Sequence, residues 1–217
     1  MSETFDYAAG TLESRNPLRR FAHRARYRLA AELVHGSALD YGCGDGHFLR
    51  LVAGRTDERL GYDPWEYAAP KDVPFVRDLS AVDGRFDYIT CLEVVEHMST
   101  SMVRQFWEDV MRLLKPDGTL IVSVPVLIGP AGFFKAMLYR GKEAGYTTGV
   151  ALRYLVGAPP ARDTSEDRMF THLHFDYRSV RSMLRDKFVH VRQVNCPFRL
   201  LPAGLNSQLF FICSGWR

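Results

Sequence analysis

The glycine-rich stretch LDYGCGDGHFLRL, residues 39–51, constrains the fold of this chain more than any other feature of its sequence. An apolar run leads into three glycines at alternate positions, and an apolar-periodic run follows them. Gly42 and Gly44 permit backbone conformations, and a close approach of a ligand, that a Cβ atom would forbid. A helix over residues 46–53 would direct its free N–H groups at that ligand. The stretch therefore predicts a strand, a turn and a helix around a nucleotide-like ligand.

Short apolar runs and helical stretches alternate along the following part of the chain. We predict strands over residues 37–42, 59–63, 73–78 and 86–92, and a fifth strand within 113–125. An amphipathic helix is predicted over 101–114, with one face formed by Met102, Phe106, Val110 and Leu113. Pro116 is expected to end that helix in a turn before the fifth strand. This alternation is typical of a doubly wound parallel sheet.

Residues 126–172 break the alternation, because they are glycine-rich, aromatic and irregular. A long irregular connection in a compact domain is usually functional, so a lid or a substrate wall is expected there. A helix over 178–188, a strand over 189–195 and an apolar run over 208–213 follow. The last two have no helix between them and are expected to pair antiparallel.

Length and composition indicate one globular domain: the chain has 217 residues, of which 47% are hydrophobic and 24% are charged. The net charge of +3 does not by itself imply a polyanionic partner. Residues 14–28, however, hold six arginines and a histidine without an acid. We expect a solvated helix face there, with the opposite face buried through Phe21, Ala25, Leu29 and Leu33. The alternative is a surface for an anionic substrate, a nucleic acid or a membrane.

The cysteines and the apolar runs bear on the compartment. Four scattered cysteines without a CxxC pair are typical of a reducing environment. No signal peptide precedes the first motif, and the most apolar stretch, residues 120–134, is too short and too broken to span a bilayer. We therefore expect a cytoplasmic protein without a transmembrane segment.

The glycine pattern separates two kinds of nucleotide ligand. A dinucleotide fingerprint, G-x-G-x-x-G, would need a glycine at position 47, where this chain has His47. Asp40 closes the strand before the turn, and a carboxylate there is unfavourable beside a pyrophosphate. It suits a ligand that carries an ammonium group, such as the amino-acid end of a sulfonium cofactor.

LDYGCGDGHFL resembles motif I of the class I S-adenosylmethionine-dependent methyltransferases. Residues 86–98 and 113–125 are similar to later motifs of that family, in order and at family spacing. The resemblance implies that Asp63, 21 residues after Gly42, bridges the ribose hydroxyls and that Asp78 contacts the adenine amino group. The residues that it implies for binding S-adenosyl-L-methionine are Asp40, Tyr41, Gly42, Gly44, Gly46, Asp63, Pro64, Asp78, Leu79 and Leu92.

The same resemblance implies an α/β fold: a single Rossmann-like class I methyltransferase domain with a mostly parallel seven-stranded sheet, the last strand antiparallel and helices on both faces. We expect one domain over residues 1–217. Its parts would be an N-terminal helical cap (1–35), a cofactor-binding core (36–125), an irregular substrate-side insertion or lid (126–175), and a C-terminal helix and strand pair (176–217).

A second group of polar residues, Glu93, Glu96 and His97, follows the fourth predicted strand. Their spacing of i, i+3 and i+4 places them on one face if the chain turns helical there. That face would lie at the carboxyl end of the strands, beside the methyl group of the cofactor. Two carboxylates and an imidazole can bind a divalent cation or supply a general base.

The spacing E-x-x-E-H resembles two metal-using groups, the ubiquinone-pathway catechol O-methyltransferases and the small-RNA 2′-O-methyltransferases. Both use a further histidine downstream, and this chain offers His172 and His174. The resemblance implies Mg²⁺ or another divalent cation on Glu93, Glu96, His97 and one of these two histidines. The alternative without a metal makes His97 the base, with Glu93 near the cofactor, and a purely structural role for the group is the third possibility.

The leading functional hypothesis is O-methylation of a hydroxyl on a small molecule, such as a sugar, a phenolic diol or a lipid-linked diol. No N-P-P-Y/F stretch follows the fourth strand, which disfavours amino-methylation of nucleobases or glutamine. The alternatives are an RNA 2′-O-methyltransferase, with the arginine-rich segment as a phosphate contact, and a non-catalytic regulatory protein that binds S-adenosylmethionine. Peripheral membrane contact and the oligomeric state stay open.

Overall fold

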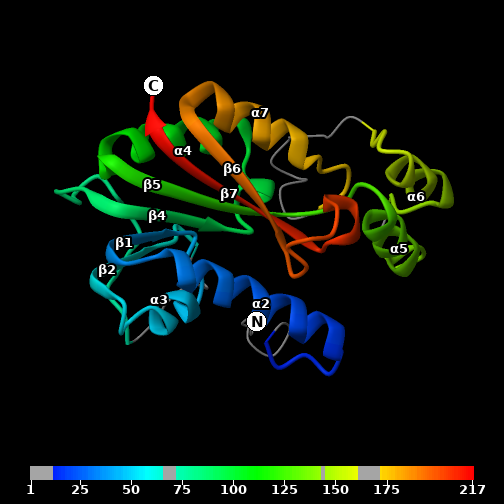
Figure 1. The fold of residues 1–217 in the computed structure, drawn as a ribbon, viewed down its shortest axis with the longest axis horizontal. Coiled ribbons are helices and arrows are strands. Elements are labelled where there is room, and N and C mark those ends of the chain that lie inside the picture. Colours follow the sequence, from blue (N-terminus) through cyan, green and yellow to red (C-terminus); the bar gives the residue numbers. More distant parts are fainter. Residues whose placement is uncertain (1–11, 66–71, 143–144, 161–171) are drawn as a thin grey trace. The chain divides into compact units, whose positions relative to one another are not determined.

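The computed structural model describes residues 12–65, 72–142, 145–160 and 172–217 (Figure 1). The chain divides into two compact units that alternate along the sequence. The first unit comprises Met1–Leu92 and Glu108–Val122, and the second comprises Glu93–Trp107 and Ser123–Arg217. The glycine-rich stretch belongs to the first unit, and Glu93, Glu96 and His97 belong to the second.

The strands form a seven-stranded sheet in the order β3-β2-β1-β4-β5-β7-β6. The strands are β1 (Gly36–Tyr41), β2 (Thr56–Tyr62), β3 (Phe75–Val76), β4 (Phe86–Leu92), β5 (Leu114–Pro125), β6 (Phe188–Cys196) and β7 (Gln208–Trp216). β1 pairs in parallel with β2 and with β4, and β2 pairs in parallel with β3. β6 and β7 pair antiparallel. The predicted α/β fold, with a mostly parallel sheet and an antiparallel end, is confirmed.

In the first unit β1 is the central strand, and its position explains why the glycine turn follows it. Ala38 and Leu39 are buried, as expected for a strand with neighbours on both edges. The chain passes from β1 outward to β2 and β3, and then returns to place β4 on the other edge of β1. Ligands of open α/β sheets bind at the carboxyl ends of strands where the strand order reverses in this way.

Helix α2 (Pro17–Leu33) begins at an Asn16 cap whose side chain accepts the N–H groups of Leu18 and Arg19. The predicted buried face is wrong at its start, because Phe21 is 51% exposed. The buried positions are Arg26, Tyr27, Leu29, Ala30 and Ala31. The Tyr27 ring packs against the His47 and Phe48 rings of α3, so aromatic contacts rather than the spacing-four row orient the helix.

Two element boundaries differ from the sequence predictions. Helix α3 covers only His47–Leu51, and it ends soon after the glycine turn at a Val52 cap. Strand β5 begins at Leu114, directly after α4 (Thr100–Leu113), so the turn predicted around Pro116 is part of the strand. The buried face of α4 is as predicted at Phe106, Val110 and Leu113.

In the second unit, helix α7 (Tyr177–Lys187) packs on β6 and β7 (Figure 1). Before it, η1 (Val95–His97) is a single 3-10 turn, and η3 (Ala203–Leu205) is another before β7. The segment 126–172 was predicted to be irregular, and this prediction is wrong over part of its length. It contains α5 (Pro130–Tyr139) and α6 (Thr148–Leu155).

Small residues explain why helices α5 and α6 were missed. Their buried positions are Gly132 and Ala136 on α5, and Ala151 and Tyr154 on α6. Glycine and alanine allow close approach of backbones but give no apolar periodicity in the sequence. α5 contacts α6 and η3, and the Gly129 N–H donates to the Tyr154 carbonyl at 2.8 Å.

We expect the Gly132→Ala variant to be less stable to urea by about 1–3 kcal/mol. A Cβ atom at Gly132 would overlap the Leu127 carbonyl oxygen, so the backbone would have to move. Gly149→Ala in α6 is the matched control, because its Cβ would meet only the Thr147 Oγ1 atom, at 3.7 Å. Equal unfolding midpoints for the two variants would contradict the close packing of α5.

The four cysteines are free and buried. The described residues therefore present no thiol at the surface. Burial raises the pKa of the Cys213 thiol to about 12. Within the described residues, no helix has the length and apolar character that spanning a bilayer requires.

Candidate functional site

The three glycines of the turn after β1 all have left-handed backbone conformations. Gly42, Gly44 and Gly46 have φ values of 82°, 54° and 77°. The N–H groups of Gly42 and Cys43 both donate to the Tyr62 carbonyl, at 2.7 and 3.0 Å, which ties the turn to the end of β2. Residues that carry a Cβ atom rarely adopt these φ values, so the conformation of the turn explains why glycine occurs at each position.

Asp63 holds the glycine turn from the end of β2. Its Oδ2 accepts the Gly44 N–H at 3.0 Å, and its Oδ1 accepts the Trp65 N–H at 3.0 Å. The side chain is buried, which raises its pKa, while the two N–H groups act in the opposite direction. The predicted cofactor residue therefore has a structural partner in the predicted glycine turn, and contact with the ribose hydroxyls stays a prediction.

Asp40 is buried within the first unit, where Thr90 of β4 lies opposite it in the strand register. The Thr90 hydroxyl donates to the Asp40 Oδ1 at 2.7 Å. Burial raises the pKa of Asp40 to about 7, against the effect of the Thr90 hydrogen bond and with a contribution from Asp63. Thr90 was not predicted, although its hydroxyl in the apolar run FDYITCL was a signal for a buried polar partner.

We expect the free energy of unfolding to fall as the pH rises from 3.8 to about 7, through the carboxyl group of Asp40. In this range the folded protein keeps a proton that the unfolded chain has released, so raising the pH favours the unfolded chain. The effect is on the order of a few kcal/mol. Urea unfolding of the wild type and of Asp40→Asn at both pH limits measures it. If the free energy of unfolding of Asp40→Asn fell with pH as steeply as that of the wild type, Asp40 would not be the group responsible.

Asp78, predicted to contact the adenine amino group, lies on the surface beside Ser80. Its Oδ1 accepts the Ser80 N–H at 2.8 Å, and its Oδ2 accepts the Ser80 hydroxyl at 2.6 Å. These bonds lower the pKa of the Asp78 carboxyl group. Leu79, the next predicted residue, is buried. The local turn is a sufficient reason for an aspartate here, and the adenine contact stays a prediction.

The remaining predicted cofactor residues have different surroundings within the first unit. Tyr41 is buried, and its hydroxyl donates to the Asp109 Oδ2 at 3.2 Å. Pro64 is exposed after β2, and Leu92 is half-buried as the last residue of β4. Tyr41 therefore contributes its side chain to the core, and only its backbone remains as a candidate ligand contact.

Glu93 begins the second unit in an unusual backbone conformation. Its φ is 61°, although it is not glycine. Its N–H donates to the Ser123 carbonyl at 3.0 Å, and its Oε1 accepts the Ser123 hydroxyl at 3.4 Å. Left-handed non-glycine residues cluster at functional sites, where surrounding contacts hold the strained conformation. The predicted helical face with Glu96 and His97 does not form, because only the 3-10 turn η1 follows.

Glu96, His97 and His172 form a compact donor cluster in the second unit. The Nε2 atoms of His97 and His172 lie 3.1 Å apart, and the His172 Nε2 lies 3.9 Å from the Glu96 Oε1. One donor atom from each residue lies within 4.8 Å of the others. Glu96 is completely buried, whereas both histidines are half-buried. Among the described residues, these three form the group of possible metal ligands, and Glu93 is not a member.

The structure distinguishes the two downstream histidines. The Phe175 N–H donates to the His172 carbonyl at 3.1 Å and closes a turn in which His174 has a φ of 62°. The His174 N–H donates to the Tyr154 hydroxyl at 2.7 Å. The turn therefore separates the surroundings of the two side chains, and His172 is the one beside His97.

The donor set fits a divalent cation. Metal–nitrogen bonds of about 2.1 Å place neighbouring ligand atoms roughly 3 Å apart, which is similar to the separation of the two Nε2 atoms. Two imidazoles and one carboxylate suit manganese, iron, cobalt or zinc better than Mg²⁺, which prefers oxygen ligands. Without a cation, one imidazole donates its N–H to the other, and the pair can accept a proton during catalysis.

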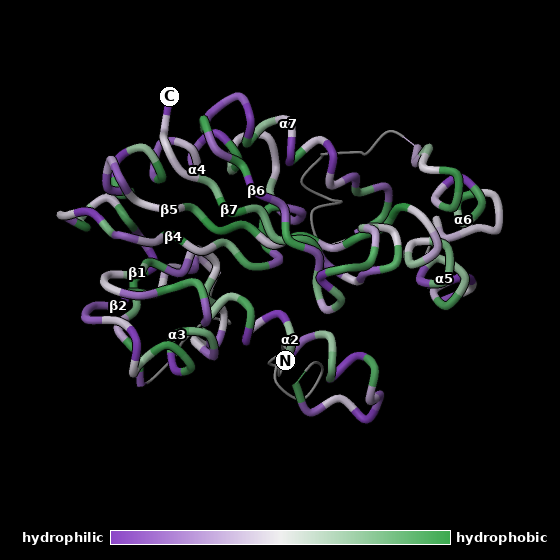
Figure 2. Tube along the Cα trace, in the orientation of Figure 1, coloured by the Kyte–Doolittle hydropathy of each residue, from purple (hydrophilic) through white to green (hydrophobic). Residues whose placement is uncertain are grey.

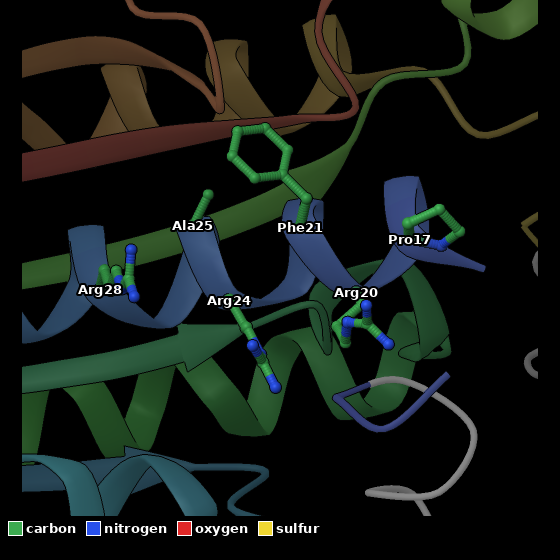
Figure 3. Close-up of a pocket in the computed structure, with 6 residues that line it drawn as sticks. All are labelled: Pro17, Arg20, Phe21, Arg24, Ala25 and Arg28. Atoms are coloured by element: carbon green, nitrogen blue, oxygen red, sulfur yellow. The ribbon is translucent and has the colours of Figure 1, made fainter. Parts of the chain in front are cut away.

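A second polar feature is a shallow cavity of about 280 Å³ on the surface of α2 (Figure 3). It is lined by Pro17, Arg20, Phe21, Arg24, Ala25 and Arg28. Arg20, Arg24 and Arg28 recur at spacing four, and in Figure 3 Arg20 and Arg24 extend from the same side of the helix. This arginine row is the solvated helix face that the sequence predicts, and it can contact an anion.

The chain is similar to known methyltransferases in sequence. A family model described as a methyltransferase domain matches residues 13–177. A relative, the ubiquinone biosynthesis O-methyltransferase of Cereibacter sphaeroides, is 30% identical over 103 residues. This match covers 39% of the chain and 39% of the relative, so the chain matches well under half of that protein's length.

Solved structures share the fold at low identity. PH0226 protein from Pyrococcus horikoshii OT3 is 18% identical with a TM-score of 0.61, covering 97% of this chain and 96% of its own. The methyltransferase domain of bacterial CtHen1-C has 16% identity and a TM-score of 0.58 over 89% of this chain and 99% of its own. N-methyltransferase NodS from Bradyrhizobium japonicum WM9, in complex with S-adenosyl-L-homocysteine, has 16% identity and a TM-score of 0.55 over 93% of this chain and 89% of its own.

Proposed function

The chain belongs to the methyltransferase domain family, and we propose that it transfers a methyl group from S-adenosylmethionine to a hydroxyl group of a small molecule that carries a second oxygen beside it. The Glu96, His97 and His172 cluster is the observation that carries the choice of acceptor. A cation held by these residues would have room for two neighbouring acceptor oxygens, which is why a vicinal diol is the proposed substrate class.

The reaction that we propose needs a base. The acceptor oxygen attacks the methyl carbon, the bond from carbon to sulfur breaks as the new bond to oxygen forms, and the sulfur keeps the electron pair. The hydroxyl proton must leave. Without a cation, the Nε2 of His97 or of His172 can accept it; with a cation on both nitrogens, the proton would pass to solvent water. Glu96 stabilises positive charge on that imidazole pair, because a buried carboxylate favours a nearby cation. A divalent cation at the cluster, when bound, lowers the pKa of a coordinated hydroxyl and orients it.

The cofactor would bind in the first unit, at the turn formed by Gly42, Gly44 and Gly46. Support comes from the family match, from the positive φ values of these glycines and from Asp63, which holds the Gly44 N–H. The resemblance to a complex of NodS with S-adenosyl-L-homocysteine supports the same cofactor class.

A second candidate function is RNA 2′-O-methylation, and the arginine row on α2 favours it. Arg20, Arg24 and Arg28 are suited to contact successive phosphates. Binding to a short RNA that weakens steeply with salt, and that is lost in the Arg24→Glu variant, would favour this candidate. Binding to RNA that is weak at every salt concentration would favour a small-molecule acceptor.

The test of the proposed function is a methyl-transfer assay with labelled S-adenosylmethionine. Matched acceptors are catechol and phenol, which differ only in the second hydroxyl, together with a nucleoside that has vicinal ribose hydroxyls. We expect transfer to the diols, loss of transfer in EDTA, and better recovery with Mn²⁺ than with Mg²⁺. Equal rates of methyl transfer to phenol and to catechol would contradict a vicinal diol as the acceptor. Methyl transfer that EDTA leaves unchanged would assign the proton transfer to the imidazole pair without a metal.

A further inference from the structure

The second unit exposes an unusual number of large apolar side chains around α5 and α6. Among the described residues, fifteen large hydrophobic side chains are exposed, and nine of them lie on α5, on or directly after α6, or in the segment 198–205. We name these nine the apolar surface: Phe134, Leu138, Leu152, Leu155, Val156, Phe198, Leu200, Leu201 and Leu205. Leu200 is 99% exposed and Val156 is 75% exposed. Large exposed apolar patches mark interaction sites, so this group of side chains is a candidate for one.

The elements that carry the apolar surface adjoin one another. α5 contacts both α6 and η3, and Gly129 at the start of α5 lies against Gly204, as their close backbones show. In Figure 1, α5 and α6 run side by side, and Figure 2 shows hydrophobic residues along both helices. α5 buries Gly132 and Ala136, and α6 buries Ala151 and Tyr154. Phe134 and Leu138 of α5 and Leu152 and Leu155 of α6 are exposed.

The segment that presents Leu200 is held by side-chain hydrogen bonds. Asn206 is almost completely buried, and its side chain accepts the Phe198 N–H at 2.7 Å and donates to the Leu201 carbonyl at 3.2 Å. The Asn195 amide also donates to the Leu201 carbonyl, at 2.7 Å. These bonds fix the backbone on both sides of Leu200, so burial of this residue by a partner would cost little backbone entropy.

Basic residues accompany the apolar surface. Residues 126–160 contain four basic residues and one acidic residue, and residues 196–207 contain Arg199 and no acid. Arg140 donates to the Thr148 hydroxyl at 2.9 Å, and Arg153 donates to the Ala158 carbonyl at 3.0 Å, so these bonds go to neutral oxygens and leave the positive charges in place. Apolar side chains together with arginine and lysine are the chemistry of a segment that enters the headgroup layer of an anionic membrane.

We infer that the apolar surface docks on an anionic lipid bilayer, with its leucines and phenylalanines in the acyl boundary and its basic residues at the headgroup phosphates. A second copy of the chain fits less well, because a symmetric contact would bring the same positive charges together. RNA fits less well, because bases stack on aromatic side chains and seven of the nine residues are aliphatic. The inference does not depend on which acceptor the site methylates.

The test is co-sedimentation of the full chain with vesicles of phosphatidylcholine, with and without phosphatidylglycerol. We expect binding to the anionic vesicles at least about tenfold stronger than to the neutral ones, weakening with salt. The double variant Leu138→Ser with Leu200→Ser should lower binding about tenfold or more. Its matched control, Met111→Ser with Val189→Ser, removes two exposed apolar side chains elsewhere and should bind as the wild type does.

A charge-reversed pair, Arg140→Glu with Arg153→Glu, should also lose binding, whereas Arg20→Glu with Arg24→Glu on α2 should keep most of it. The reverse pattern would overturn the inference and place lipid binding on the arginine row. Sedimentation velocity tests the remaining alternative, a second copy of the chain. If the wild type were a dimer that did not bind vesicles, and the Leu138 and Leu200 double variant were a monomer, the apolar surface would be a dimer interface. Circular dichroism of each variant and its transfer activity to a soluble acceptor show that folding and the methyl transfer are intact.

Discussion

The His172→Ala variant is expected to lose methyl transfer by about 10²-fold or more in kcat/KM. His172 places its Nε2 3.1 Å from that of His97 and within reach of Glu96, so its removal breaks the donor cluster whether the cluster holds a cation or a proton. The affinity for S-adenosylmethionine should stay unchanged, because its predicted contacts lie in other residues. Initial rates and calorimetry of the same preparation measure both quantities.

The control for this variant is His174→Asn, two residues away. Asparagine tolerates the left-handed backbone that His174 adopts, so the turn and its bond to Tyr154 should persist. Mn²⁺ titration followed by electron paramagnetic resonance gives a readout besides activity: His172→Ala should weaken binding, and His174→Asn should not. Normal activity in His172→Ala, with loss in His174→Asn, would show that the cluster is assigned to the wrong histidine.

The Asp63→Ala variant should bind S-adenosylmethionine about 10- to 100-fold more weakly. Asp63 accepts the N–H groups of Gly44 and Trp65, and the loss of a charged acceptor leaves the glycine turn unsupported as well as removing the predicted ribose contact. Asp63→Asn should have an intermediate effect, since its amide oxygen can accept one of the two bonds.

Asp83→Ala is the matched control for Asp63→Ala, because Asp83 is an exposed carboxylate of the same unit. Calorimetric titration with S-adenosylmethionine and S-adenosylhomocysteine gives the affinities, and far-ultraviolet circular dichroism reports folding. If Asp63→Ala were folded and bound both ligands as tightly as Asp83→Ala does, the cofactor would not use the end of β2.

Strand positions followed from local pattern where a buried strand is apolar, as in β4, whereas the polar start of β2 was not predicted. The predicted strand 86–92 coincides with β4, and the predicted strands 37–42 and 59–63 overlap β1 and β2. The glycine turn could also be predicted from the sequence, since Gly42, Gly44 and Gly46 all adopt the positive φ that favours glycine. In each of these cases the local backbone conformation or the burial of the position requires a particular residue type, so the requirement can be recognised in the sequence.

Other features depend on partners far along the chain. Helices α5 and α6 were missed because three of their four buried positions are glycine or alanine, and Tyr154 is the fourth. The exposure of Phe21 on α2 was missed because spacing alone does not show which face of a helix has a partner. Thr90 was missed because its role is to donate to Asp40, which lies 50 residues earlier. Each of these positions is decided by packing between segments.

By itself the sequence determined the α/β fold, the glycine turn that closes β1, and a short set of polar residues for the site. The tertiary structure decided between His172 and His174, because a turn closed at Phe175 brings only His172 to the Nε2 of His97, 75 residues earlier in the chain. Among the described residues, Glu93 is not in that donor cluster; its backbone is left-handed, and its Oε1 accepts the Ser123 hydroxyl. Residue type fixes which atoms can donate, but their separation depends on how distant segments pack.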